Sequence, residues 1–325
     1  MPLIGEGGVG LIRKPAALKD GSTLGIIAPA SPCGNPDSIA RGKIILEEMG
    51  FRVVLAPNAL KSDRYLAGTD SERVADLHRM FLDPRIDGIL CLRGGYGTLR
   101  LLRQINYRII KSRPKVLVGY SDITALQLAI WQKAGLVTFS GPMLASDFGL
   151  EPGDFTVNHF YQALTSYHPL GPVPAAPGAM THTIYPGRAR GRLIGGNLSL
   201  VAATLGTPYE IDTRGAILFL EEVGEEPYRV DRMLRQLYLA GKLHKAAGVV
   251  FGEFVDCEAG DKSASFTCGE ITADLFNRLK IPCFYGLGPG HGASKVTMPL
   301  GVKAQIDAGR CQLVIIEPAV VAPFK

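Results

Sequence analysis

The first half of this 325-residue chain alternates short apolar runs with longer segments whose apolar residues recur at helical spacing. The short runs predict buried strands, and the longer segments predict helices. Such alternation is typical of a mostly parallel sheet with helices on both faces, a Rossmann-like α/β arrangement. Ligands of these sheets bind beyond the carboxyl ends of the strands. The predicted strands are 24–28, 51–56, 86–92, 115–118 and 136–140, and the predicted helices are 37–49, 71–81 and 123–133.

The length of the chain favours two domains, because single hydrophobic cores stop growing beyond about 250–300 residues. Between residues 167 and 188 the sequence becomes rich in proline and glycine and loses its periodicity. We therefore predict a linker at 167–188, an N-terminal α/β domain at 16–166 and a smaller, β-rich α/β C-terminal domain at 189–325. The strands expected in the second domain are 216–220, 248–251, 282–285, 296–300 and 311–316, and its helices are 228–240 and 270–279.

Composition argues against several classes of function. The net charge of +5 is small and includes no block of Lys and Arg, so we expect no nucleic-acid partner. No apolar run reaches membrane-spanning length, and the segment from Met1 to Leu18 lacks the apolar stretch of a secretory signal. The six cysteines form no C-x-x-C pair, and no zinc-binding spacing occurs. We expect a cytoplasmic protein with no membrane partner and no metal.

Ser121 lies at the corner between a predicted strand and a predicted helix, within the sequence Val-Gly-Tyr-Ser-Asp-Ile-Thr at 118–124. A corner of this kind lifts a hydroxyl group above the edge of a sheet and directs helix N–H groups toward the atom that it attacks. The context is that of a nucleophile elbow, although Ile123 replaces the usual second glycine. Ser121 could instead be an N-cap that simply begins the helix. This segment alone favours the cap.

A serine nucleophile needs a base that accepts its proton and an acid that orients the base. His291 suits the first role, because it lies in a Gly-Pro-Gly-His-Gly turn directly after a predicted strand. Glu221 and Glu222 end another predicted strand, and only one of them can point toward the site, since successive side chains alternate faces. Two alternatives stay open: His291 as a turn residue bonded to backbone, and the glutamates as the exposed start of an acidic loop.

A glycine-rich segment, Arg93-Gly-Gly-Tyr-Gly97, follows the third predicted strand. Glycines there let a backbone N–H group approach a ligand closely. A phosphate site is the weaker interpretation, because the chain has neither a Gly-Lys-Ser/Thr motif nor G-x-G-x-x-G. We therefore predict that this segment supplies an oxyanion-hole donor, paired with the N–H group of Asp122 directly after the nucleophile.

Five motifs occur in order along the chain: Arg93-Gly-Gly-Tyr-Gly97, Gly119-Tyr-Ser-Asp122, Gly195-Gly-Asn197, the stretch from Leu220 to Arg232, and Gly288-Pro-Gly-His291. Together they resemble the L,D-carboxypeptidase family of serine peptidases, which includes muramoyltetrapeptide carboxypeptidases and the microcin C self-immunity peptidases. The resemblance implies a triad in which Ser121 is the nucleophile, His291 the general base and Glu221 the residue that orients His291, with Glu222 as second choice.

The resemblance also implies an α/β N-terminal domain and a smaller β-rich C-terminal domain, with the site in the groove between them. It implies an oxyanion hole formed by the backbone N–H groups of Gly95 and Asp122. It also implies a homodimer and no cofactor or metal. The implied reaction removes the terminal D-alanine of a murein tetrapeptide, at the bond after meso-diaminopimelate, in the recycling of peptidoglycan.

The terminal carboxylate of such a substrate requires a cation or a cluster of N–H groups. Arg93 and Arg232 are both candidates, and the sequence does not choose between them. Asn197 could bind the backbone of the substrate, or it could hold the turn formed by the two glycines before it.

Two other functions compete with this prediction. A peptidase of the same family that detoxifies a peptide–nucleotide antibiotic would want an aromatic residue in the second domain to stack on the base. The only tryptophan, Trp131, lies instead in the predicted helix after Ser121, where it suits the core. A non-catalytic two-domain protein that binds a small ligand would not need Ser121, His291 and a strand-end glutamate together. We therefore predict the murein tetrapeptide carboxypeptidase.

Overall fold

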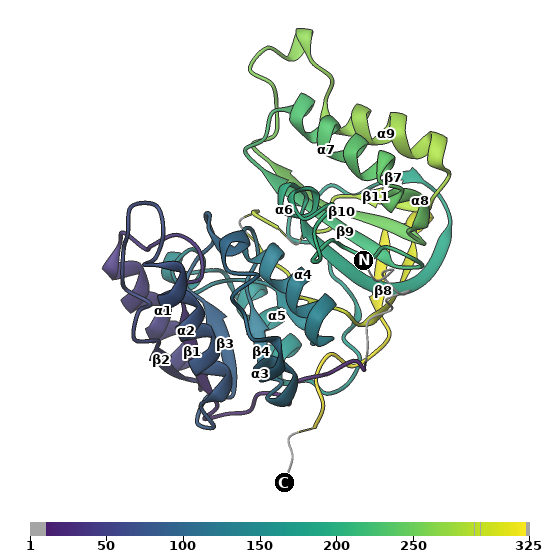
Figure 1. The fold of residues 1–325 in the computed structure, drawn as a ribbon. Helices are drawn as coiled ribbons and strands as arrows, with labels where there is room; N and C mark the ends of the chain where they lie inside the picture. The colour runs from purple at the N-terminus through teal and green to yellow at the C-terminus, as the bar shows by residue number, and fades with distance from the viewer. Residues whose placement is uncertain (1–10, 289, 293, 323–325) are drawn as a thin grey trace, which may run out of the picture.

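A computed structural model describes residues 11–288, 290–292 and 294–322 of the chain. These residues form two lobes, each built on one sheet, with the first half of the chain at lower left and most of the second half at upper right (Figure 1). One sheet is mostly parallel and the other is mixed. This architecture confirms the predicted fold class.

The sheet of the first lobe contains five parallel strands in the spatial order 2-1-3-4-5, which is typical of flavodoxin-like folds. Its strands, from edge to edge, are β12 (Met298–Leu300), β5 (Thr138–Ser140), β4 (Val116–Val118), β3 (Gly88–Cys91), β1 (Thr23–Ile27) and β2 (Arg52–Leu55). Its helices are α1 (Pro36–Glu48), α2 (Asp70–Leu82), α3 (Tyr107–Ser112), α4 (Ile123–Ala134) and α5 (Asp154–Thr165), with 3₁₀ turns η1 (Thr98–Arg100) and η2 (Phe148–Leu150).

In the second sheet β8, β9, β10 and β11 run parallel, and the outer strands are antiparallel. From edge to edge its strands are β6 (Gly171–Pro172), β14 (Gln312–Ile315), β13 (Lys303–Asp307), β8 (Arg188–Asn197), β9 (Ile217–Val223), β10 (Gly248–Val255), β11 (Cys283–Tyr285) and β7 (His182–Tyr185). The accompanying helices are α6 (Leu198–Ala203), α7 (Pro227–Leu239), α8 (Lys242–Lys245) and α9 (Cys268–Leu279), with 3₁₀ turns η3 (Lys262–Ala264) and η4 (Ala308–Arg310).

Each of the two sheets includes strands from parts of the chain that the sequence did not assign to it. Strand β12 comes from the second half, yet it pairs with β5 and completes the first sheet. The segment 167–188 contains β6 and β7, which form the two opposite edges of the second sheet. Short strands at edges tolerate proline and glycine, because one side of their backbone needs no partner strand. The division into 16–166, 167–188 and 189–325 stays a prediction.

Helix α4 is buried on nearly all sides, and only Gln132 and Lys133 of its residues are not buried. It contacts β5 and α3 of its own lobe and α6 and β8 of the other lobe, so it lies between the two sheets (Figure 1). This position explains why ten of its twelve residues are buried. Gln127 fixes its start, since Nε2 donates hydrogen bonds to the carbonyl oxygens of Gly119 (2.9 Å) and Phe139 (2.8 Å).

The junction between β8 and α4 gives a test of this packing. Gly196 has φ +140°, and an added methyl group would lie 2.5 Å from Oγ1 of Thr124 on α4. We expect Gly196→Ala to lower the free energy of unfolding by about 1–3 kcal/mol, through backbone strain and steric overlap. Gly206→Ala is the matched control, because Gly206 also has positive φ but open space around it. Denaturant titration should show the larger loss for Gly196→Ala, and equal losses would contradict the described junction.

Candidate active site

Ser121 occupies a strained corner between β4 and α4. Its φ is +63°, a left-handed conformation that is uncommon for any residue except glycine. The N-cap of α4 is Asp122, and Ser121 makes no capping hydrogen bond with its side chain among the described residues. A side chain in such a turn is directed by the backbone, as in a nucleophile elbow. The geometry therefore favours the elbow over the simple N-cap.

The glycine-rich loop after β3 lies directly against Ser121. An added methyl group on Gly94 would lie 2.9 Å from Cβ and 3.0 Å from Oγ of Ser121. Two hydrogen bonds, both donated by Thr98 to Asp122, connect the loop to the corner. Thr98 N–H donates to the Asp122 carboxylate (2.8 Å), and Thr98 Oγ1 donates to the Asp122 carbonyl (2.6 Å). Burial raises the pKa of this carboxyl group.

The backbone N–H groups of Gly95 and Asp122 donate no hydrogen bond to any other residue in the described part of the chain. Both belong to segments that the structure places beside the Ser121 side chain. Two free N–H groups beside a nucleophile are what an oxyanion hole requires.

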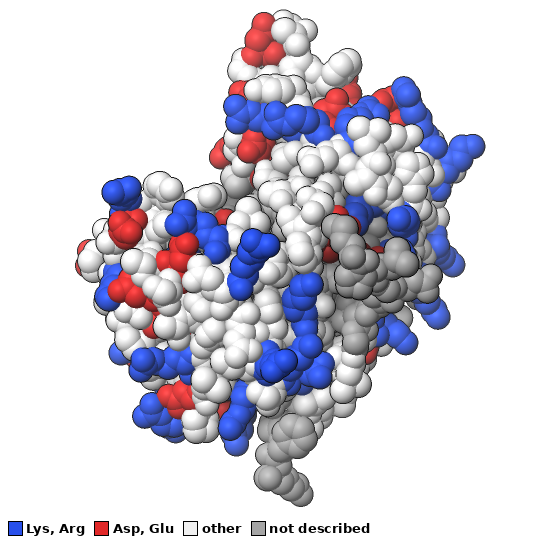
Figure 2. Space-filling model, in the orientation of Figure 1, with Lys and Arg blue, Asp and Glu red and all other residues white. Residues whose placement is uncertain are grey.

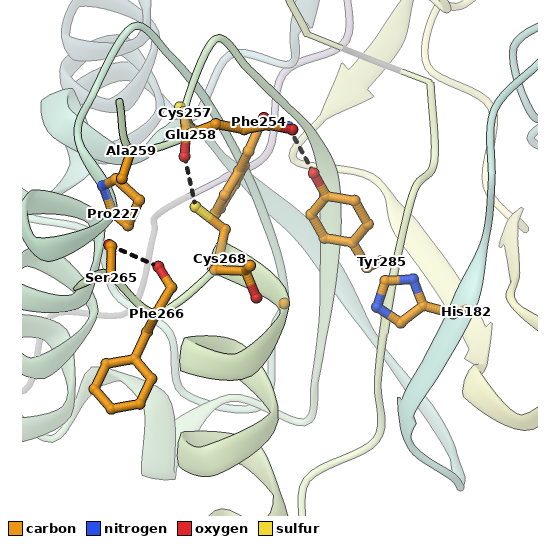
Figure 3. Close-up of a pocket in the computed structure, with 12 residues that line it drawn as sticks. His182, Pro227, Phe254, Cys257, Glu258, Ala259, Ser265, Phe266, Cys268 and Tyr285 are labelled. Atoms are coloured by element: carbon orange, nitrogen blue, oxygen red, sulfur yellow. Dashed lines mark hydrogen bonds between the residues drawn. The ribbon is translucent and has the colours of Figure 1, made fainter. Parts of the chain in front are cut away.

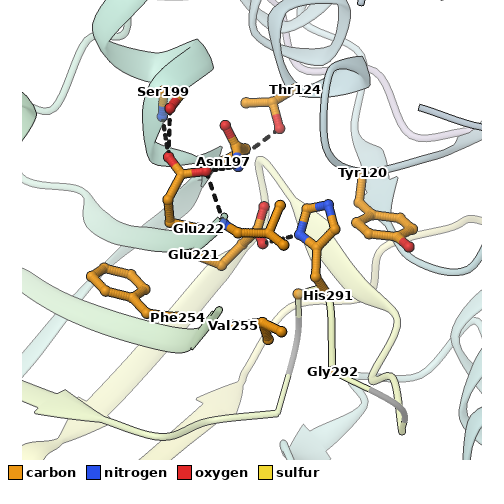
Figure 4. Close-up of polar contacts among 12 residues, drawn as sticks. Tyr120, Thr124, Asn197, Ser199, Glu221, Glu222, Phe254, Val255, His291 and Gly292 are labelled. Atoms are coloured by element: carbon orange, nitrogen blue, oxygen red, sulfur yellow. Dashed lines mark hydrogen bonds and ion pairs between the residues drawn. The ribbon is translucent and has the colours of Figure 1, made fainter. Parts of the chain in front are cut away.

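Glu221 and His291 come together at the end of β9, as Figure 4 shows. Nδ1 of His291 lies 2.7 Å from Oε2 of Glu221, whose side chain is 1% exposed. Because a carboxylate can only accept, Nδ1 carries the proton and Nε2 is free to accept another. This is the tautomer that a general base beside a serine needs.

Glu222 points to the opposite face of the strand and has a different environment. Its Oε1 accepts hydrogen bonds from Nδ2 of Asn197 (2.8 Å) and from the N–H of Val223 (2.9 Å). Its Oε2 accepts from the N–H (2.8 Å) and the hydroxyl group (2.7 Å) of Ser199. Burial raises the pKa of Glu222. Four donors hold this carboxyl group, so it links β9 to the start of α6 and does not face His291 (Figure 4).

Tyr120 directly precedes Ser121 and contacts the loop that carries His291. Its ring lies edge to face with the imidazole of His291, with 4.9 Å between centroids. The hydroxyl group of Ser121 and the imidazole are not hydrogen-bonded to each other in this structure, in which both residues are described. Catalytic hydrogen bonds of this kind often form fully only in the substrate complex. The ring contact makes the corner and the loop neighbours. Ser121 belongs to the first lobe, whereas His291 lies on the segment that connects β11 of the second sheet to β12 of the first.

The three predicted substrate-binding residues lie in different settings. Arg93 is half-buried at the end of β3, and its Nε is buried without a hydrogen-bond partner among the described residues. Asn197 is 3% exposed and caps α6 while bonded to Glu222, which favours the structural alternative for it. Arg232 is exposed on α7, in a groove with Leu205 and Gln236 that includes no residue of the predicted triad. The structure does not bring Arg232 together with Ser121.

A separate pocket of about 350 Å³ lies between the N-terminal ends of α7 and α9 (Figure 3). Phe254, Phe266 and Tyr285 contribute its aromatic wall, and no residue of the predicted triad lines it. The Cys257 and Cys268 thiols there are protonated at neutral pH, because burial raises the pKa of Cys257 to about 11 and that of Cys268 to about 12.

The described residues contain neither a candidate metal site nor a helix that could cross a membrane. Across 11–288, 290–292 and 294–322, no group of three or more His, Cys, Asp or Glu could hold a metal ion. In the same ranges no helix has the length and apolar character needed to cross a membrane. On the face drawn in Figure 2, Lys and Arg are scattered over both lobes among Asp and Glu.

Comparison with protein families gives two matches. The model of the LD-carboxypeptidase N-terminal domain matches residues 24–141, and that of the LD-carboxypeptidase C-terminal domain matches residues 190–306. A probable murein peptide carboxypeptidase of Bacillus subtilis is 41% identical, over 95% of this chain and 96% of its own length.

Solved structures of two kinds are similar to this one. The muramoyltetrapeptide carboxypeptidase of Oxalobacter formigenes has a TM-score of 0.80 and 32% identity, covering 91% of this chain and all of its own. MccF in complex with glutamyl sulfamoyl guanosine has a TM-score of 0.88 and 27% identity, covering 94% of this chain and 99% of its own. The microcin C7 self-immunity protein MccF of Escherichia coli is 29% identical in sequence, over 94% of this chain and 96% of its own length.

The contrast between the two glutamates predicts unequal losses of stability when each is replaced by glutamine. In Glu222→Gln an amide nitrogen would replace an oxygen that accepts two hydrogen bonds, so donors would face donors. We expect a loss of about 1–3 kcal/mol in the free energy of unfolding. Glu221→Gln should cost less, because Oε1 of Glu221 has no partner within the described residues and the other oxygen can still accept from His291. Thermal unfolding of both variants checks this, and a larger loss for Glu221→Gln would contradict it.

Proposed function

Because the chain belongs to the LD-carboxypeptidase family of serine-type peptidases, we propose that it removes the terminal D-alanine from murein tetrapeptides with a triad of Ser121, His291 and Glu221. The observation that carries this proposal is the 2.7 Å hydrogen bond between buried Glu221 and His291, beside the left-handed corner at Ser121. The names of the Bacillus subtilis and Oxalobacter formigenes relatives support the murein peptide as substrate.

The reaction begins when Oγ of Ser121 attacks the carbonyl carbon between meso-diaminopimelate and D-alanine. His291 accepts the serine proton on Nε2, while Glu221 holds the ring in the required tautomer and stabilises the imidazolium that forms. The carbonyl oxygen becomes an oxyanion, and the N–H groups of Gly95 and Asp122 bind it. Donors aimed at that oxygen are worth more in the transition state than in the ground state, so they accelerate the step.

Collapse of the tetrahedral intermediate breaks the C–N bond. His291 gives its proton to the leaving amine, and D-alanine departs while the rest of the peptide stays on Ser121 as an ester. His291 then accepts a proton from a water molecule, whose oxygen attacks the ester. The ester bond breaks, Ser121 regains its proton, and the shortened peptide leaves.

We assign the terminal carboxylate of the substrate to Arg93. A carboxypeptidase must recognise that group, and a guanidinium suits it because of its paired donors. Arg93 directly precedes Gly94, which contacts Ser121, and its Nε lacks a partner among the residues described. Asn197 is the weaker candidate because its side chain is already bonded to Glu222 and α6. The biological setting that we propose is the recycling of cell-wall peptides by a cytoplasmic homodimer.

The similarity to MccF supports a second candidate, the hydrolysis of a peptidyl nucleotide. Trp131 cannot stack on a nucleobase, because it is 6% exposed within α4. The pocket with the aromatic wall in the second lobe includes no residue of the proposed triad. We therefore rank this activity behind the murein tetrapeptide.

The assay that tests the proposal is release of D-alanine from L-Ala-γ-D-Glu-meso-diaminopimelate-D-Ala. We expect Ser121→Ala and His291→Ala to abolish release, because each removes a group that the first step requires. Glu221→Gln should lower kcat by about 10²–10⁴-fold, since it weakens control of the tautomer. His168→Ala is the matched control, because His168 is exposed outside the site, and it should match the parent protein.

No release by the parent protein would refute the murein tetrapeptide as substrate, and peptidyl nucleotides would be tested next. Full release by Ser121→Ala would refute the serine mechanism itself.

A further inference from the structure

We propose that Lys295 is a positioning residue that holds the His291 loop in register with the Ser121 corner. The inference rests on the proposed function, since it assigns His291 the role of base. Lys295 lies four residues after His291 and is 6% exposed. A lysine is rarely buried to this extent unless its charge is compensated.

The ammonium group of Lys295 is hydrogen-bonded to the loop on both sides of His291. Nζ of Lys295 donates a hydrogen bond to the carbonyl oxygen of Gly290 (3.1 Å) and another to that of Gly292 (2.7 Å). These two glycines flank His291 directly. Glycines leave a backbone free to adopt many conformations, so an external constraint is needed to fix the imidazole between them.

The same ammonium group also contacts two side chains of the first lobe. It lies 3.3 Å from Oδ1 of Asp147 and 4.8 Å from the centre of the Tyr120 ring. Oδ1 of Asp147 also accepts a hydrogen bond from the Tyr120 hydroxyl group (3.2 Å), and its Oδ2 accepts from the N–H of Met143 (2.8 Å). The charge is thus paired with a carboxylate and an aromatic face, which compensates for its burial.

Through these contacts the ammonium group of Lys295 connects the loop that carries His291 to the corner that carries Ser121. Tyr120 is adjacent to Ser121, and its ring contacts both the imidazole of His291 and the ammonium group of Lys295. A small displacement between nucleophile and base lowers a rate strongly, by about 10²-fold for 1 Å. Lys295 therefore acts through His291, and it is not expected to touch the substrate.

A second buried lysine provides a matched control. Lys115 is 9% exposed, and its Nζ also donates to two backbone carbonyl groups, those of Met80 and Asp83. Both carbonyl groups lie at the end of α2, and no contact of Lys115 involves the triad. Lys115→Met and Lys295→Met remove the same kind of group, so both should lower the unfolding temperature.

Kinetics of D-alanine release, measured well below the unfolding temperature, separate positioning from stability. We expect Lys295→Met to lower kcat by about 10²-fold with little change in KM, whereas Lys115→Met keeps the kcat of the parent. Lys295→Arg retains the charge but not the geometry of both carbonyl contacts, so its kcat should lie between those of Lys295→Met and the parent. If Lys295→Met does not fold, Lys295→Arg alone decides the question, and a kcat equal to that of the parent would overturn the proposal.

A measurement without substrate keeps this inference separable from the proposed function. Nitrogen-15 spectra of the imidazole rings, with the His291 signals assigned by His291→Ala, report which ring nitrogen carries the proton. We expect the Nδ1–H form in the parent and in Lys115→Met, and a mixture of tautomers in Lys295→Met. If the parent releases no D-alanine, the proposed substrate fails and these spectra decide the role of Lys295. A parent-like His291 spectrum in Lys295→Met, or equal loss of kcat in both lysine variants, would overturn it.

Discussion

The burial of α4 between the two sheets is the constraint on which the rest of the site depends. The helix begins directly after Ser121, and its apolar sides face both lobes. A helix packed on two sides cannot shift without opening a core, so the strained corner at its start is held in place. The positive φ of Ser121 costs conformational energy, and the packing of α4 against both lobes offsets this cost. The strained corner is therefore compatible with a stable fold.

The same packing divides the site between the lobes. Ser121 and the glycine-rich loop follow strands β4 and β3 of the first sheet, while Glu221 lies within β9 of the second. His291 lies between β11 of the second sheet and β12 of the first. The loop that carries the proposed base is thus anchored in a different sheet at each end, and Lys295 with Asp147 adds a contact between this segment and the first lobe. Relative motion of the lobes would change the distance between Ser121 and His291.

The adjacent residues Glu221 and Glu222 have different surroundings, because successive side chains of a strand point to opposite faces of the sheet. Glu221 meets an imidazole on one face, and Glu222 meets four donors on the other. The sequence could establish that only one of them points toward the site, but the choice between them came from resemblance. Local sequence does not reveal which face of β9 is turned toward a loop that lies about 70 residues away.

Local patterns were sufficient for the five parallel strands of the first sheet, since apolar runs and helical periodicity specify those elements directly. The segment around Ser121 taken alone favoured an N-cap, and the left-handed φ that favours the elbow is a finding of the structure. They were insufficient for β12, whose pairing with β5 joins residues far apart in sequence. Strand β8 was not predicted either, because arginines alternate along its first half, which is partly exposed. Lys295 was missed because its role arises from partners far apart in sequence, namely Tyr120, Asp147 and the glycines beside His291. A single charged residue in the otherwise uncharged run after His291 was the available signal.

We propose that the substrate binds where the two lobes meet at Ser121. A crystal structure of a substrate complex tests this most directly. The Ser121→Ala variant would be crystallised with the intact murein tetrapeptide, which it should bind without cleaving. The account predicts that the carbonyl group before D-alanine lies over residue 121, with its oxygen facing the N–H groups of Gly95 and Asp122 and the terminal carboxylate at Arg93. A peptide bound instead in the pocket between α7 and α9, with its scissile bond away from residue 121 and His291, would contradict the account.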